Sequence, residues 1–209
     1  MGTLAVNRKG KIIGAAQASY TLAHGVSTGT ATDNITGNQG DATQYFFSTG
    51  RGGETHRFTR TFLHFDTSGI GAGVSGMSLQ LTGVTNADES VFGIEHSAGS
   101  SEGEVISNDD FNNINRENIY TQSTSWSTGA ITMTFTAAGL ADAIANDHFN
   151  IALLGKNDQD AAEEGPLASG GDISNGIAFN STIQLSYTDA PSGYNNTVNF
   201  VADDGIAKV

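Results

Sequence analysis

Cysteine is absent from this sequence, and proline occurs only twice. Without cysteine the chain forms no disulfide, holds no thiolate-bound metal and has no cysteine nucleophile. No stretch approaches the ~20 consecutive apolar residues of a membrane-spanning helix, and the beginning of the chain lacks the continuous apolar core of an export signal. We therefore expect a protein that is made and kept in a cytoplasm, or is assembled there into something larger.

Charged residues are also scarce, because only 15% of the chain is Asp, Glu, Lys or Arg. The balance is lopsided, with 22 acidic residues against 9 basic ones and a net charge of -13. An acidic surface repels nucleic acid, whose binding depends on cations that meet phosphates, and it disfavours anionic membranes. Protein and neutral or weakly charged glycan remain as polymer partners, although negative charge also serves simply to keep a β-rich protein soluble.

The chain is rich in glycine, with 27 residues, and in Thr, Ser and Asn, a mixture that favours strands and tight turns over helices. The clearest strand is residues 57–65, in which successive side chains alternate between two faces. One face carries Thr59, Thr61, Leu63 and Phe65, and the other carries Phe58, Arg60, Phe62 and His64. Since both faces carry aromatic residues, we expect this strand to be central in its sheet and covered on both sides.

Roughly eight strands separated by turn signals are expected between residues 44 and 189. Residues 140–148 are the one helical candidate, and residues 97–125 are expected to be a loop. This pattern predicts an all-β fold, an antiparallel β-sandwich of the jelly-roll type with one short helix. Residues 1–43 are expected to form an extended N-terminal arm, docked on a neighbour or on its own domain, and residues 190–209 a C-terminal tail.

Several segments carry a resemblance to a known group of proteins. The stretch RTFLHFDTSGIGAGVSGMSLQL has a strand that ends in an aromatic-Asp-Thr signature, then a short loop and a strand with alternating leucines. The segments STSWSTG, AAGLADAIANDHFNIALLGKNDQD and STIQLSY follow it in a matching order. Together they resemble the carbohydrate-binding-module type of jelly-roll sandwich, which is found in secreted glycan-active enzymes and in virion proteins of tailed phages. The closing VNFVADDGIAKV is similar to terminal segments of phage structural proteins. Of the two groups, this favours the virion proteins over the secreted enzymes.

Asp66 stands where a strand passes into a glycine-rich loop. Its carboxylate is expected to accept hydrogen bonds from the backbone N–H groups of Ser68 or Gly69, which is a structural turn and not a catalytic role. The histidines have no close metal-binding spacing, and His64 is expected to be a packed residue; the five are His24, His56, His64, His96 and His148. We assign no catalytic, cofactor-binding or metal-binding residue.

Two further features are candidate binding sites. Four acidic residues of one loop, Asp158, Asp160, Glu163 and Glu164, lack the spacing of a calcium loop. The resemblance allows a structural Ca²⁺ there, but a solvated acidic loop is preferred. Trp126, with Tyr120 near it, could stack on a sugar ring, but burial at the end of the sandwich core is the preferred interpretation.

The resemblance implies a non-enzymatic structural protein of a tailed-phage virion, such as a capsid decoration, fibre or tail component. Its expected partners are other copies of itself, in a homo-oligomer, and other virion proteins after assembly in the host cytoplasm; nucleic acid and membrane are not expected. The alternative is a carbohydrate-binding module for cell-surface or environmental polysaccharide. A polysaccharide lyase or hydrolase would need paired carboxylates, and no local motif supports one.

Overall fold

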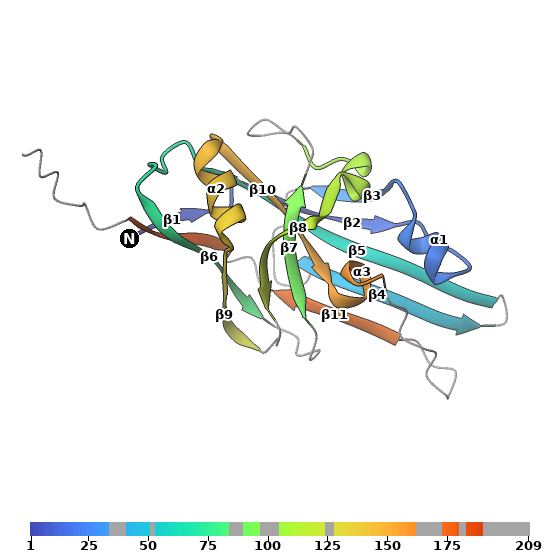
Figure 1. The fold of residues 1–209 in the computed structure, drawn as a ribbon. Coiled ribbons are helices and arrows are strands. Elements are labelled where there is room, and N and C mark those ends of the chain that lie inside the picture. Colours follow the sequence, from blue (N-terminus) through green and yellow to red (C-terminus); the bar gives the residue numbers. More distant parts are fainter. Residues whose placement is uncertain are drawn as a thin grey trace, which may run out of the picture.

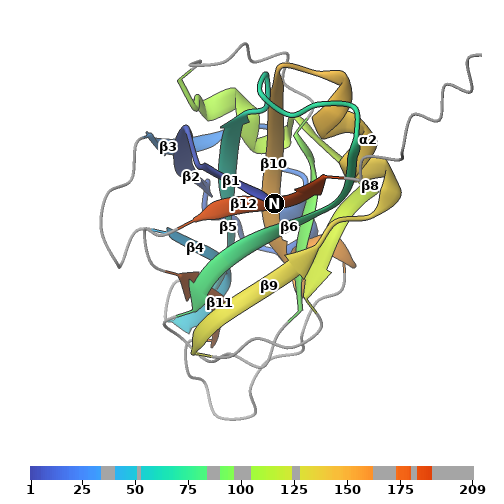
Figure 2. The ribbon, with the colours of Figure 1, turned by 90° about the vertical axis from the view of Figure 1, so that its left-hand side faces the viewer.

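The computed structural model describes residues 1–33, 41–50, 53–83, 90–96, 105–123, 128–161, 173–179 and 183–189. Most of these residues lie in strands, which form two antiparallel sheets (Figures 1 and 2). The prediction of an all-β antiparallel sandwich is confirmed, and the arrangement is consistent with a jelly roll.

The first sheet is built around one long strand, β5. One edge of β5 pairs with β2, which in turn carries β3. The other edge pairs first with β4, to which β11 is added, and then with β10, which is followed by β7 and β8. The strands of this sheet are β2 (Arg8–Gly14), β3 (Gly29–Asp33), β4 (Asp41–Gly50), β5 (Gly53–Asp66), β7 (Val91–His96), β8 (Ile114–Ser123), β10 (His148–Gly155) and β11 (Ile173–Phe179).

The second sheet has the order β1-β12-β6-β9 and lies in front in Figure 2. Its strands are β1 (Gly2–Ala5), β6 (Val74–Gly83), β9 (Gly129–Thr134) and β12 (Gln184–Asp189). The two sheets are joined at their edges, because Phe179 of β11 pairs with Gly83 of β6, and Thr121 of β8 forms a bridge with Phe135 just after β9. The strands therefore belong to one continuous hydrogen-bonded network.

The main hydrophobic core lies between the two sheets. Leu63 and Phe65 of β5 meet Leu79 of β6 and Met133 of β9 there, and all four side chains are at most 1% exposed. The alternating leucines of β6 face this core, and in β9 every second residue does so as well. Burial of each such side chain stabilises the fold by about 1.5–3 kcal/mol before entropy costs are counted.

A second apolar cluster covers the opposite face of the first sheet. Phe58 and Phe62 of β5 and Ile94 of β7 belong to it, and all three are fully buried. The short helix α1 (Tyr20–His24) and the 3-10 helix η1 (Asn108–Asn112) cover this face with Tyr20, Ala23 and Phe111. The prediction that both faces of β5 are covered is therefore confirmed.

The described part of the region expected to be an N-terminal arm belongs to the sandwich itself. β1 pairs with β12, and β2 pairs with β5 beside the centre of the first sheet. Ile12 of β2 is fully buried in the second cluster. Residues 1–33 are thus docked on the domain of the same chain. The predicted tail at residues 190–209 lies outside the described residues.

The helix predicted at residues 140–148 is present, but it lies earlier in the chain, as α2 (Ala137–Ala145), and His148 already belongs to β10. It begins after Thr136, whose hydroxyl accepts a hydrogen bond from the Gly139 N–H. Two further short helices are α1 and α3 (Lys156–Gln159). None of the described helices has the length and apolar character needed to cross a membrane.

The prediction that residues 97–125 are a loop was wrong for its described part. Residues 108–112 form η1, and residues 114–123 form the ten-residue strand β8. β8 pairs with β7 on one side, with irregular register around Ile94, and five of its ten residues are only half-buried. An edge strand carries polar residues on more than one side, and this obscured the alternation that identifies a strand.

Candidate functional site

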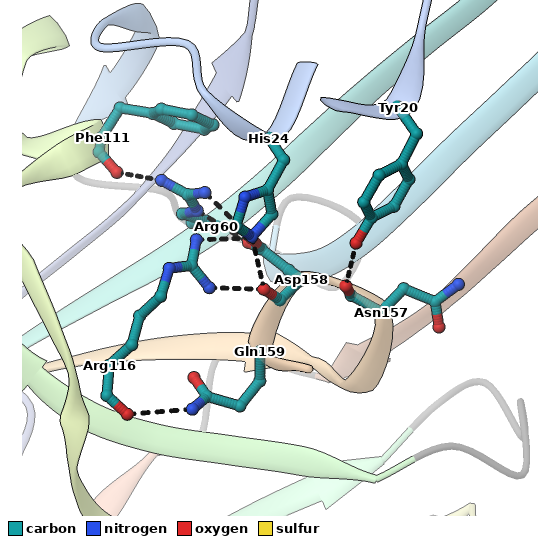
Figure 3. A network of polar contacts seen from close by, with 8 residues as sticks. All are labelled: Tyr20, His24, Arg60, Phe111, Arg116, Asn157, Asp158 and Gln159. Carbon is teal, nitrogen blue, oxygen red and sulfur yellow. Dashed lines mark hydrogen bonds and ion pairs between the residues drawn. The ribbon is translucent and has the colours of Figure 1, made fainter. Parts of the chain in front are cut away.

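A buried ionic network lies on the outer face of the first sheet and is the most polar part of the described interior (Figure 3). Asp158 of α3 is at its centre, and its side chain is 4% exposed. Arg60 of β5, whose side chain is fully buried, reaches it with Nε donating to Oδ2 at 2.7 Å and Nη2 donating to Oδ1 at 2.9 Å. Arg116 of β8 donates from Nη2 to Oδ1 at 2.7 Å and from Nη1 to the Asp158 carbonyl. One carboxylate thus holds two strands and one helix together.

Neighbouring groups complete the network. Arg60 Nη1 donates to the carbonyl of Phe111, and the guanidinium lies 3.9 Å from the centre of the Phe111 ring. His24 of α1 places Nε2 2.8 Å from the Asp158 carbonyl oxygen. Tyr20 of α1 donates its hydroxyl proton to the carbonyl of Asn157. The network therefore connects α1, η1 and α3 to the sheet that they cover.

The electrostatics keep this network ionised. Burial alone would raise the pKa of Asp158, but the charges and hydrogen bonds of Arg60 and Arg116 outweigh it and hold that pKa below its usual value. The pKa of Arg116 is lowered, chiefly by burial. The pKa of His24 is also lowered, again chiefly by burial. Two guanidinium groups face one carboxylate, so the cluster suits a structural clamp better than proton transfer.

A chain of two histidines and a carboxylate forms a second polar cluster on the same face. His64 Nε2 lies 3.2 Å from His96 Nδ1, and the two rings are stacked with centroids 5.3 Å apart. His96 Nε2 lies 3.5 Å from Oδ1 of Asp110. Both histidines are buried, with 3% and 4% of their surface exposed. His64 Nδ1 has no hydrogen-bond partner within the described structure.

The surroundings of this cluster lower the pKa of both His64 and Asp110. Burial, followed by the charge of His96, lowers the pKa of His64 to about 4. Burial opposes ionisation of Asp110, but its contact with His96 and the hydrogen bond from the Ser107 N–H lower its pKa to about 2. Asp110 is therefore a carboxylate and His64 a neutral imidazole at neutral pH.

The roles predicted for Asp66 and His64 are confirmed. Asp66 Oδ1 accepts hydrogen bonds from the Ser68 N–H at 3.0 Å and the Ser68 hydroxyl at 2.6 Å, which closes the turn after β5. His64 is packed in the interior beside His96. Among the described residues, no group of three or more His, Asp or Glu side chains is placed to hold a metal ion.

The expectation of a solvated acidic loop was wrong for Asp158, which is fully paired in the interior. The cause is tertiary: β10 places α3 directly over Arg60, which no local pattern indicates. Asp160 is exposed as expected, while Glu163 and Glu164 lie outside the described residues.

Tyr120 is not available to stack on a sugar. Its side chain is 3% exposed, and its ring stacks on Phe149 in the main core with centroids 5.6 Å apart. Burial also raises the pKa of Tyr120 well above its ordinary value. Trp126 lies outside the described residues.

A groove of about 250 Å³ lies on the second sheet, and three of the residues that line it are apolar: Leu81, Ala130 and Ile131. Gln80 and Thr82 of β6, Thr132 of β9 and Gln184 of β12 line it, and none of the lining residues in the described structure is charged. Gln184 donates from Nε2 to Oε1 of Gln80 at 2.9 Å, which orders both amides. The groove offers amide and hydroxyl groups above a rigid sheet.

Sequence reasoning did not find Arg60, Arg116, His96 or Asp110. Arg60 did carry a signal, because it stands between Phe58 and Phe62 on one face of a strand, and a buried cation requires a counter-ion. The others come from loops and an edge strand whose placement depends on the whole topology. No known family model matches this chain, and a search of curated proteins gives no significant match. Functional inference therefore depends on the geometry and on the resemblance described above.

Proposed function

We propose that this chain is a non-catalytic structural subunit of a virion of the tailed-phage type, a decoration, fibre or tail component. It acts by association with its own copies and with neighbouring virion proteins. The observation that carries this proposal is the open edge of β1, which in the described structure pairs only with β12. Open edges expose unpaired backbone groups that pair readily with a strand of another chain.

The internal clamp supports the same interpretation. The carboxylate of Asp158 forms ion pairs with Arg60 and Arg116, and these pairs connect the covering helices to the sheet. At this site the charged side chains are therefore paired with one another in the interior, which makes the subunit rigid. A subunit in a particle needs such rigidity, because its contacts are repeated in every copy.

The first experiment measures association in solution. Size-exclusion chromatography with light scattering, over a range of concentrations, is expected to show a homo-oligomer. Lysines on an edge strand block pairing, so the double change of the exposed residues Thr3→Lys and Ala5→Lys on β1 is expected to lower the oligomeric state. A strictly monomeric wild-type protein that binds no virion particle would count against the proposal.

A matched control places the same charges away from an edge. Ser78 of β6 and Ser186 of β12 lie on strands that are paired on both sides. The double change Ser78→Lys and Ser186→Lys adds equal charge without touching a free edge. It should leave the oligomer intact, and equal loss in both variants would indicate simple charge repulsion.

A second candidate function is recognition of a neutral polysaccharide, and the uncharged groove between β6, β9 and β12 favours it. Amide and hydroxyl side chains on a rigid surface suit sugar hydroxyl groups, which carry no charge. A glycan array on the wild-type protein tests this function, with Gln80→Ala and Gln184→Ala expected to abolish any signal. Ser186→Ala, on the same strand as Gln184 but outside the groove lining, is the control. Absence of binding to any glycan would remove this candidate and leave the assembly proposal standing.

A further inference from the structure

We propose that His64, His96 and Asp110 form an acid-sensitive latch, which holds η1 on the first sheet and releases it when the histidine pair takes up a second proton. The three residues come from three separate elements, β5, β7 and η1. This inference does not depend on the assembly proposal, because it concerns a device inside a single chain.

The facing nitrogens of the two histidines hold only one proton between them. His64 Nε2 and His96 Nδ1 are 3.2 Å apart, so one of them donates and the other accepts. With His64 as donor, the second nitrogen of His96 carries a proton and points toward Asp110 Oδ1 at 3.5 Å. This arrangement leaves His64 Nδ1 as an unpartnered acceptor.

A first additional proton is tolerated by this arrangement. If His96 becomes an imidazolium, it donates from Nδ1 to His64 and faces the Asp110 carboxylate with Nε2. A second proton is not tolerated, because both facing nitrogens would then carry hydrogen at a separation of 3.2 Å. Two buried cations would also be in ring contact, and burial strongly disfavours each of them.

The surroundings add to this penalty from the other elements packed against His64. Arg8 of β2 stands opposite His64 in the strand pairing, and His148 of β10 also acts on it as a positive charge. The negative charge of Asp110 in η1 acts in the opposite sense and raises the pKa of His64. Asn150 of β10, opposite His64 on the other side, is neutral. The lowered pKa of His64, about 4, agrees with this environment.

The element expected to yield is η1, because it alone of the three elements that carry the latch residues is not held in a backbone ladder. β5, β7 and β10 are each held on both sides by backbone ladders. In the described structure the contacts that hold η1 include the Asp110–His96 contact and the Ala31 N–H, which donates to Asn108 Oδ1 at 2.8 Å. Arg60 also donates to the Phe111 carbonyl and lies over the Phe111 ring, which is fully buried. Its release exposes Phe111 and the apolar cluster beneath it.

The clamp at Asp158 keeps the rest of the fold in place during this change. Arg60 and Arg116 hold the pKa of Asp158 below its usual value, so that carboxylate stays charged as the pH falls. α1 and α3 therefore remain docked. The expected acid form is a folded sandwich with η1 detached, which differs from general unfolding.

Hydrogen exchange at residues 105–112 and binding of an apolar fluorescent dye test the latch between pH 7 and pH 3. In the wild-type protein both signals are expected to rise as the pH approaches about 4, while far-ultraviolet circular dichroism stays constant. The exchange data are corrected for the intrinsic pH dependence of the rate. A dye signal that rises only together with loss of circular dichroism would overturn the proposal, because the change would then be global.

Substitution of His64 gives the decisive comparison. His64→Phe keeps a flat ring but binds no proton, so the acid transition is expected to disappear, with at least a tenfold smaller rise in exchange at residues 105–112. If this variant does not fold, His64→Asn removes the titrating group with a smaller side chain and carries the same expectation. His24→Gln is the matched control, because His24 is a partly buried histidine of the other cluster. A transition that persists in the folded His64 variant, or that disappears in His24→Gln, would contradict the latch.

Discussion

The side chains of Arg60 and Asp158 meet in the interior through two hydrogen bonds, at 2.7 and 2.9 Å, although 98 residues separate them in the chain. The fork of the guanidinium matches the two carboxylate oxygens, which is the strongest form of this interaction. Arg116 occupies the same carboxylate from the side of β8. The pair therefore connects the middle of β5 to the helix that follows β10.

Removal of the Asp158 carboxylate is expected to be one of the most destabilising single changes in the described structure. Asp158→Ala leaves two guanidinium groups in the interior without a counter-ion, and loss of one partner of a buried pair costs about 3–5 kcal/mol. Urea unfolding at pH 7 measures this loss. Asp160→Ala, two residues away and exposed, is the control and should change the free energy of unfolding by less than about 0.5 kcal/mol. A loss below about 1 kcal/mol for Asp158→Ala would show that the network is solvated.

Stability is expected to fall as the pH drops from about 6.5 to about 4, because His64 is buried in its neutral form. Its pKa in the folded state is about 4, below the ordinary histidine value of 6.5, so the unfolded chain binds the proton first. The contribution is complete above pH 6.5 and is lost progressively down to pH 4, by about 3 kcal/mol in total. Urea unfolding at half-unit pH intervals measures it.

The reference for this pH dependence is His64→Phe, whose profile should be flatter by the same amount over that window. Asp110 and Asp158 act in a lower window, because their pKa values are depressed and their contributions are lost only as the pH falls below about 4. If wild type and variant have parallel profiles between pH 6.5 and 4, His64 titrates normally and its burial has no energetic effect.

The turn after β5 is expected to depend on the Asp66 carboxylate to a modest degree. Asp66→Ala removes the acceptor of two hydrogen bonds from Ser68. Because this turn is partly solvated, we expect a loss of about 0.5–1.5 kcal/mol. Asp66→Asn keeps an acceptor oxygen and should retain most of the stability in thermal unfolding. Equal losses in both variants would point to the charge and not the hydrogen bonds.

The β-sandwich could be predicted because each central strand shows its own pattern. β5 has aromatic residues on both faces, and apolar residues alternate with polar ones in β6 and β9. In these strands the order of apolar residues in the sequence therefore matches the pattern of burial in the structure. β8 could not be predicted, since an edge strand with half-buried polar residues has no such alternation. The turn role of Asp66 was predictable because its partner is two residues away.

The polar clusters were beyond sequence reasoning for a different reason. The lone arginine between Phe58 and Phe62 required a buried acid, but nothing in the sequence distinguished Asp158 from the other acids of its loop. That choice is made by the pairing of β10 with β5, which positions α3. The contact of His64 with His96 likewise requires β10 to lie between β5 and β7.

A last prediction concerns the close packing of β7 against β8 at Gly93. A Cβ atom at this position would lie 2.6 Å from Cγ2 of Thr121, a side chain that is 1% exposed. Gly93→Ala is therefore expected to cost about 1–3 kcal/mol through overpacking. Thr121→Ser removes that methyl group and keeps the hydroxyl that donates to the Thr134 carbonyl at 2.8 Å. The double variant should recover at least half of the loss in urea unfolding, and purely additive losses would show that the strain at Gly93 lies in the backbone.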